Sequence, residues 1–207
     1  MLTFMKRSIS TLALITAGAA VLLSPCVFAD GNADTGAHHP MAQGTTRTMV
    51  DYVLPQVNLV RDDGKTVLLA DELNDGRPVV LNFIYTTCTG ICPLSSQVFS
   101  QLQEKLGATR SSVHLVSISI DPEEDTPARL VKYAKKYKAG PQWQYYTGTM
   151  EASLATQRAF DVYRGDKMAH DPVIFLRASP GKPWLRINGF VTADDLLSEF
   201  RGLVAVK

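Results

Sequence analysis

The chain has 207 residues, of which 45% are hydrophobic and 20% charged, and its mean hydropathy is near zero. This balance excludes a disordered chain, a collagen-like repeat and a polytopic membrane protein, and it fits one globular domain. Lys and Arg number 21 against 20 Asp and Glu, an even charge that argues against nucleic-acid binding.

The first 29 residues have the pattern of an export signal. Lys6 and Arg7 precede an uncharged stretch over residues 8–29, which ends at Ala29 before Asp30. We expect either cleavage after Ala29 or retention of residues 8–29 as a membrane anchor, because about 20 uncharged residues can span a bilayer. Both outcomes place the rest of the chain in the periplasm or on the extracytoplasmic face of the membrane.

Residues 30–49 are rich in Gly, Ala, Thr and Asp and lack apolar periodicity, which predicts a flexible linker. His38, His39 and Met41 lie in this segment and are of metal-ligating types. A flexible segment cannot preorganise them, so we favour a plain linker. The folded domain is expected over residues 50–207.

The first half of this domain predicts a β-hairpin, a buried strand and a helix. Two β-prone segments, 57–60 and 66–69, flank a turn containing an Asp-Gly step. Residues 79–85 are nearly all apolar, as expected of a strand covered by helices on both faces. A helix follows and stops at Gly107, and its predicted buried face consists of Leu94, Val98, Leu102 and Leu106.

The second half continues the alternation of strands and helices. We predict strands at 113–120 and 143–147, a helix from Pro127 to about Tyr137, a helix at 151–160, an irregular loop at 163–172, strands at 173–176 and 184–190, and a last helix opened by a capping box at Thr192. This order predicts an α/β fold: a thioredoxin-like three-layer α/β sandwich with an added N-terminal β-hairpin.

Two of the three cysteines belong to this domain, since Cys26 lies in the export segment. Cys88 and Cys92 fall between the buried strand and the following helix, where the helix N-terminus lowers a thiol pKa. A structural disulfide, redox cycling and a shared metal ion are the alternatives. A spacing of four suits a shared metal at least as well as a disulfide, which needs closer Cβ atoms.

Two thiolates suit Cu(I), which accepts one further nitrogen or sulfur donor. His170 is the candidate, because it ends the loop that a thioredoxin-like sheet brings beside the cysteine-bearing turn. His114 falls within a predicted strand and is expected to be packed or to face solvent.

The chain resembles the Sco/SenC family of copper-binding proteins for cytochrome c oxidase assembly. The resemblance covers residues 57–204, and its motifs are Asn82-Phe83-Ile84-Tyr85-Thr86-Thr87-Cys88 with Cys92-Pro93, Ser117-Ile118-Ser119-Ile120-Asp121-Pro122-Glu123-Glu124-Asp125-Thr126-Pro127, and His170 before an aromatic-containing strand. It implies Cu(I), with Cu(II) as a second candidate ion, held by Cys88, Cys92 and His170. The implied partner is the copper-bearing subunit of the oxidase or another copper protein.

Residues near the ligands add two narrower expectations. Thioredoxin-like proteins commonly have a cis-proline here, so a cis Asp171-Pro172 bond is a hypothesis. The acidic run at 123–125 either caps the next helix together with Thr126 or forms a docking face for a partner.

Two functions remain in competition. A metallochaperone would carry Cu(I) and either deliver it to the dinuclear copper site of the oxidase or reduce the cysteines of that site. A thiol–disulfide oxidoreductase would use Cys88 as the attacking thiol and Cys92 as the resolving thiol, with an upstream thiol reductant and no required metal. A peroxiredoxin-like peroxidase is disfavoured, because Tyr85 stands where such enzymes have Thr.

Overall fold

The structure, a computed structural model, describes residues 44–205. The predicted export signal, Cys26, and the tail residues His38, His39 and Met41 lie outside the described residues. None of the helices between residues 44 and 205 combines the length and the hydropathy that a membrane span requires.

One mixed sheet organises the domain. Its eight strands are β1 (Thr46–Val50), β2 (Asn58–Arg61), β3 (Thr66–Leu68), β4 (Val79–Ile84), β5 (His114–Ser119), β6 (Trp143–Gly148), β7 (Val173–Arg177) and β8 (Trp184–Asn188). They lie in the order β1-β8-β7-β4-β5-β6-β2-β3. The central strands β4 and β5 are parallel and buried along their whole length, as the nearly continuous apolar sequence of β4 predicts for that strand.

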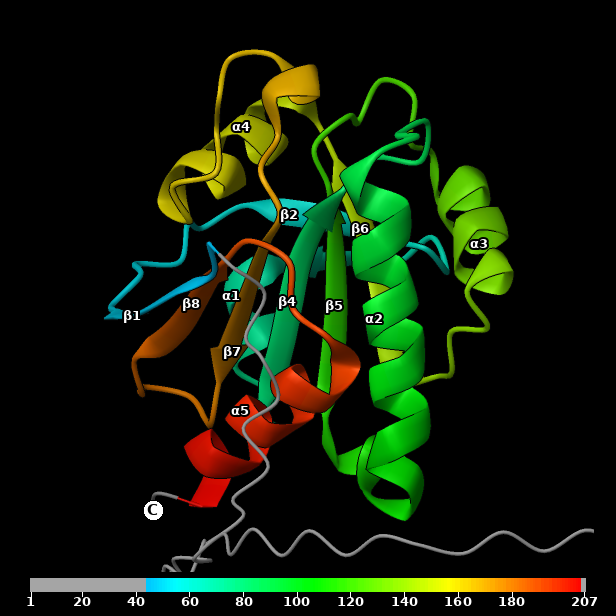
Figure 1. The fold of residues 1–207 in the computed structure, drawn as a ribbon. Coiled ribbons are helices and arrows are strands. Elements are labelled where there is room, and N and C mark those ends of the chain that lie inside the picture. The colour runs from blue at the N-terminus through cyan, green and yellow to red at the C-terminus, as the bar shows by residue number, and fades with distance from the viewer. Residues whose placement is uncertain (1–43, 206–207) are drawn as a thin grey trace, which may run out of the picture. The chain divides into compact units, whose positions relative to one another are not determined.

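Helices cover the sheet. They are α1 (Leu69–Leu73), α2 (Ile91–Leu106), α3 (Pro127–Lys136), α4 (Met150–Ala159) and α5 (Ala193–Ala205), with 3₁₀ turns at Gly107–Ser112 and Lys167–Ala169. In Figure 1, α2 and α5 lie on one side of β4 and β5, whereas α1 lies behind the sheet. The hydroxyls of Ser96 on α2 and Tyr133 on α3 are 2.9 Å apart and hydrogen-bonded, which joins these two helices. The predicted α/β fold with a β2–β3 hairpin is confirmed.

Two predicted helix starts are confirmed in detail. Thr126 caps α3, its hydroxyl accepting a hydrogen bond from the amide of Arg129, and Pro127 is the first helical residue. Thr192 and Asp195 form the predicted capping box at the start of α5.

The predicted linker is too long at its C-terminal end. Strand β1 begins at Thr46, within residues 30–49, and pairs antiparallel with β8 at the edge of the sheet. The segment has no apolar alternation because it is an edge strand with exposed positions. Strand β1 is held instead by main-chain pairing with β8 and by the ion pair between Arg47 and Glu199 of α5.

The predicted buried face of α2 is partly wrong. Leu102 and Leu106 are buried, but Leu94 is 56% exposed. A spacing of four residues advances 40° further around a helix than one turn, so positions chosen at that spacing leave the core within a few turns. Cys92 and Phe99 occupy the buried face instead.

Candidate functional site

The two cysteines lie at the end of β4 and the start of α2, as predicted. Cys88 is in the turn, where its amide donates to the carbonyl of Tyr85 over 3.1 Å, and Cys92 is in the first turn of α2. Both thiols are free; Cys88 is half-buried, whereas Cys92 is 1% exposed. One thiol is therefore open to partners and the other lies beneath it.

The environment gives the two thiols opposite acidities. Burial alone would raise the pKa of Cys88, but hydrogen bonds from the Cys92 thiol and the Cys92 amide, the latter 3.5 Å from Sγ, outweigh it and lower the pKa. Burial, followed by the hydrogen bond to Cys88, raises the pKa of Cys92. The site thus holds one activated thiol and one protonated thiol at neutral pH.

A buried carboxylate braces the turn that carries Cys88. Asp125 is fully buried and accepts hydrogen bonds from the amide and hydroxyl of Thr86 and from the hydroxyl of Ser119, the last over 2.6 Å. Burial raises the pKa of Asp125, although these hydrogen bonds oppose the shift. The acidic run was predicted to cap α3 or to form a docking face, and this inward role of Asp125 was missed.

His170 has one nitrogen engaged and one free. Its Nε2 lies 3.1 Å from the carbonyl oxygen of Phe83 in β4, so Nε2 carries the proton and donates it. Nδ1 then has a lone pair, and it is buried without a hydrogen-bond partner. Burial lowers the pKa of the ring, which keeps it neutral at pH 7. A neutral imidazole with a fixed tautomer and an unpartnered nitrogen is suited to bind a metal ion.

Ion pairs fix the loop that ends at His170. Lys167 Nζ lies 2.6 Å from Asp121 Oδ2 at the end of β5, and Arg164 Nε lies 2.9 Å from Asp171 Oδ2. The hypothesis of a cis bond before Pro172 is wrong, because residues 44–205 contain no cis peptide bond. The trans form is the lower-energy state of such a bond, and cis requires a tertiary context that overcomes this preference.

Cys88 and His170 line one pocket of about 180 Å³, together with Tyr85 and Met168. In the described part of the chain, no three His, Cys, Asp or Glu side chains are close enough to hold a metal ion. The structure therefore brings Cys88 and His170 to one pocket with Cys92 beneath, but not into a closed ligand set.

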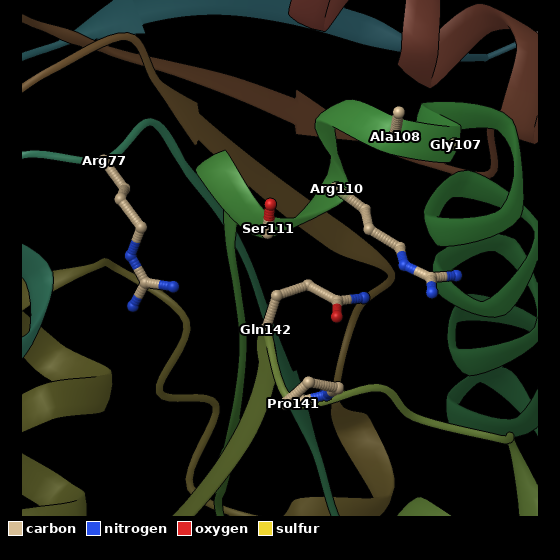
Figure 2. Close-up of a pocket in the computed structure, with 7 residues that line it drawn as sticks. All are labelled: Arg77, Gly107, Ala108, Arg110, Ser111, Pro141 and Gln142. Carbon is tan, nitrogen blue, oxygen red and sulfur yellow. The ribbon is translucent and has the colours of Figure 1, made fainter.

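A larger cavity, of about 630 Å³, lies at the opposite end of the sheet (Figure 2). Its lining includes Arg77, Arg110, Ser111 and Gln142, and no thiol, imidazole or carboxylate. It offers nothing to a soft metal ion.

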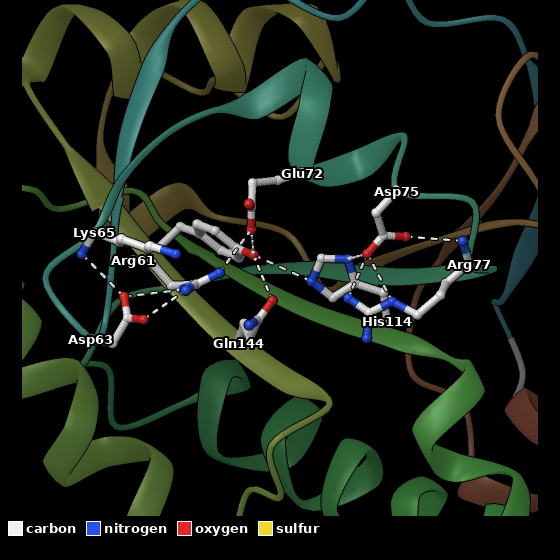
Figure 3. Close-up of polar contacts among 9 residues, drawn as sticks. Arg61, Asp63, Lys65, Glu72, Asp75, Arg77, His114 and Gln144 are labelled. Atoms are coloured by element: carbon white, nitrogen blue, oxygen red, sulfur yellow. Dashed lines mark hydrogen bonds and ion pairs between the residues drawn. The ribbon is translucent and has the colours of Figure 1, made fainter.

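His114 is packed, one of the two expected alternatives. It is fully buried, with Nε2 3.2 Å from the hydroxyl of Tyr146 and Nδ1 3.4 Å from Asp75 without hydrogen-bond geometry (Figure 3). Tyr146 also donates to Glu72 over 2.7 Å. Burial lowers the pKa of His114. This cluster lies at the start of β5, far along the strand from the cysteines, so His114 is structural.

These features define a class: a thioredoxin-like domain with a pair of thiols at a helix start and a histidine on the facing loop. The chain matches the SCO1/SenC family over residues 46–205, and it belongs to that family. It is 28% identical over 169 residues to the SCO1 protein homolog of Bacillus subtilis. The alignment covers 76% of this chain and 86% of that protein.

Two solved structures extend this likeness. BsSco, a member of the Sco family of cytochrome c oxidase assembly proteins in which a disulfide switch has been identified, has a TM-score of 0.63 at 27% identity, covering 77% of this chain and 98% of BsSco. Arabidopsis thaliana ScoI with copper bound has a TM-score of 0.62 at 26% identity, covering 72% of this chain and 96% of that one. The thioredoxin-like fold is thereby confirmed.

Two residues that line the pocket, Tyr85 and Met168, were not predicted from the sequence to belong to the site. Tyr85 was placed in the buried strand and in the family motif but not in the site, yet it lines the pocket of Cys88 and its hydroxyl donates to Met168 Sδ over 3.4 Å. Met168 was part of an irregular loop, and only a search for sulfur side chains near His170 could have singled it out.

Proposed function

We propose that this protein is an extracytoplasmic copper chaperone that holds Cu(I) through Cys88, Cys92 and His170. The observation that carries the proposal is the buried, unpartnered Nδ1 of His170, a residue that lines the same pocket as Cys88. Soft sulfur donors with one imidazole suit Cu(I), and a copper-bound relative supports the choice of ion. The export pattern of residues 1–29 supports the location.

Copper binding in this proposal needs the loop before Pro172 to move, since no three ligands converge in the described residues. Two long ion-paired side chains, Lys167 and Arg164, hold this loop and are each partly exposed. The Arg164–Asp171 pair joins two solvent-accessible side chains, and a pair of this kind is worth only about 1 kcal/mol or less, so copper ligation can displace it. The Lys167 pair ends on the buried carboxylate of Asp121 and is not of this kind.

The proposed recipient is the copper-bearing subunit of cytochrome c oxidase, with Cu(I) passing to it by ligand exchange. The resemblance to BsSco, a protein of oxidase assembly, supports this partner.

Thiol–disulfide exchange is a second candidate, favoured by the opposite pKa shifts of the two thiols. The Cys88 thiolate attacks one sulfur of a target disulfide and releases the other as a thiolate that takes up a proton. Cys92 then loses its proton and attacks the Cys88 sulfur, which releases the second target thiol. The target gains two electrons, and the chain is left with a Cys88–Cys92 disulfide that an upstream thiol reductant must reduce.

One pair of variants separates these functions. His170→Ala should abolish tight Cu(I) binding, measured by competition with a chelator, and leave the reduction of a small disulfide largely unchanged. Cys88→Ser should lose both activities. Tight Cu(I) binding by His170→Ala at the strength of the parent protein would refute the ligand assignment.

A further inference from the structure

Met168 carries a thioether at the mouth of the pocket that Cys88 and His170 line. The proposed function gives this side chain no role. Its side chain is 73% exposed, although methionine is usually buried, and it contributes little to the core. Its Sδ accepts a hydrogen bond from the Tyr85 hydroxyl over 3.4 Å, and it lines the same pocket as Cys88 and His170. The sulfur is therefore directed toward the thiol site.

Tyr85 connects Met168 to the pocket. Its hydroxyl donates a hydrogen bond to Met168 Sδ over 3.4 Å, and Tyr85, Met168 and Cys88 line the same pocket, so the thioether and the activated thiol share one cavity. Methionine has an unbranched, flexible side chain, and Sδ can turn into the pocket without moving the backbone.

The backbone of Met168 is itself held in place. The Asp166 side chain accepts a hydrogen bond from the amide of Met168 over 2.8 Å, and the neighbouring Lys167 pairs with Asp121. These contacts fix the 3₁₀ turn that carries Met168 over the pocket. The thioether is thus positioned by the fold.

The four side chains differ in access from solvent. Cys92 and the Nδ1 of His170 are buried, whereas Cys88 is half-buried and Met168 exposed. An ion that arrives from a partner meets Met168 and Cys88 first. A neutral thioether is a soft ligand that carries no charge, so it can hold Cu(I) briefly and give it up again.

We propose that Met168 Sδ is a further copper ligand of this protein, one that binds Cu(I) beside Cys88 while the ion enters and leaves the pocket. This inference rests on the proposed copper function and adds an entry and exit ligand to it. No electron is transferred, because the step only exchanges one neutral ligand, the thioether of Met168, for another, the imidazole of His170, around the same Cu(I) ion.

The first test compares two thioether-to-alkyl changes. Met168→Leu keeps the size and removes the sulfur, and Met49→Leu on β1 is the matched control because Met49 is also exposed, at 52%. Each reduced protein is mixed with a Cu(I)–bicinchoninate complex, and the transfer of Cu(I) is followed by absorbance. Met168→Leu should slow transfer by about tenfold, at the lower end of what losing a contact around a metal costs. Met49→Leu should match the parent.

The second test observes the thioether directly. In protein labelled with ¹³C at the methionine methyl groups, the signal lost in Met168→Leu is that of Met168, and one equivalent of Cu(I) should shift it in the parent. Parent-like transfer by Met168→Leu, or a Met168 methyl signal that does not move, overturns the inference.

The experiments distinguish failure of this inference from failure of the proposed copper function. If Cu(I) binds and needs Cys88 and His170, but not Met168, only the further inference fails. If the reduced parent binds no Cu(I), both fail.

Discussion

At the scale of single residues, Asp125 shows how a buried carboxylate positions a reactive thiol without contacting it. It fixes Thr86, two residues before Cys88, through three hydrogen bonds to the amide and hydroxyl. All its partners are donors, so only an acceptor fits the position. The turn that carries Cys88 is therefore held in place by a residue on the connection between β5 and α3.

Asp125→Asn should lower the free energy of unfolding by about 1–3 kcal/mol, because its amide NH₂ meets donors where the carboxylate accepted hydrogen bonds. Urea denaturation at pH 7 measures the change. Glu124→Gln is the control, since Glu124 is exposed and forms its ion pair with the exposed Arg129, and it should change stability by less than about 0.5 kcal/mol. Equal effects of the two changes would show that Asp125 does not brace the turn.

At the scale of elements, the start of α2 sets the reactivity of both thiols. Iodoacetamide should alkylate Cys88 in Cys92→Ser with a pH midpoint below the ordinary thiol pKa, because the serine hydroxyl can donate to Cys88 in place of the Cys92 thiol and the amide of residue 92 still donates. Cys92 in Cys88→Ser should stay largely unreactive at neutral pH, because burial raises its pKa. Labelling rates between pH 5 and 10 measure the midpoint of Cys88 and show whether Cys92 reacts at all, and a more reactive Cys92 would reverse the assigned roles.

The edge strand β1 depends on the turn that joins β8 to α5. Gly189 in this turn has φ +94°, and an added Cβ would lie 3.2 Å from the carbonyl oxygen of Gly44 and 3.3 Å from Thr45 Cα. Gly189→Ala should therefore cost about 1–3 kcal/mol of stability. In α5, Gly202 has open space for a Cβ, so Gly202→Ala should gain up to about 1 kcal/mol. Thermal melting of both variants checks the pair, and a neutral Gly189→Ala would mean that the turn can rearrange.

At the scale of the whole molecule, two neutral histidines, the buried His114 and the half-buried His170, make stability depend on pH. The pKa values of His114 and His170 are lowered by burial, so the unfolded chain, with an ordinary pKa near 6.5, binds protons first as pH falls. Stability should be at its full value above pH 6.5 and decline below it. Urea midpoints at pH 7.5 and 5.5, with NMR titration of both rings, measure this effect. Ring midpoints at or above 6.5 would contradict it.

The sequence predicts the elements that local signals specify. The apolar run of β4, the Thr126 and Thr192 caps and the Asp-Gly hairpin each depend on neighbouring residues, and each is confirmed. β1 and the role of Asp125 could not be predicted, because they depend on pairing with β8 and on Thr86, both distant in sequence.

The same division applies to the site. The position of Cys88 and Cys92 at a helix start follows from the chain order of strand, turn and helix. The free Nδ1 of His170 depends on the carbonyl of Phe83, and the orientation of Met168 depends on Tyr85. Both contacts join segments more than 80 residues apart, so no local pattern carries them.

The copper stoichiometry of the protein in its two redox forms tests the central claim most directly. Cu(I) is titrated against a chelator into the reduced protein and into the protein with a Cys88–Cys92 disulfide. We predict one tightly bound ion per reduced chain and none per oxidised chain, because the same two sulfur atoms serve as ligands and as disulfide partners. Equal binding by both forms, or no binding by the reduced form, would contradict a copper site built on these thiols.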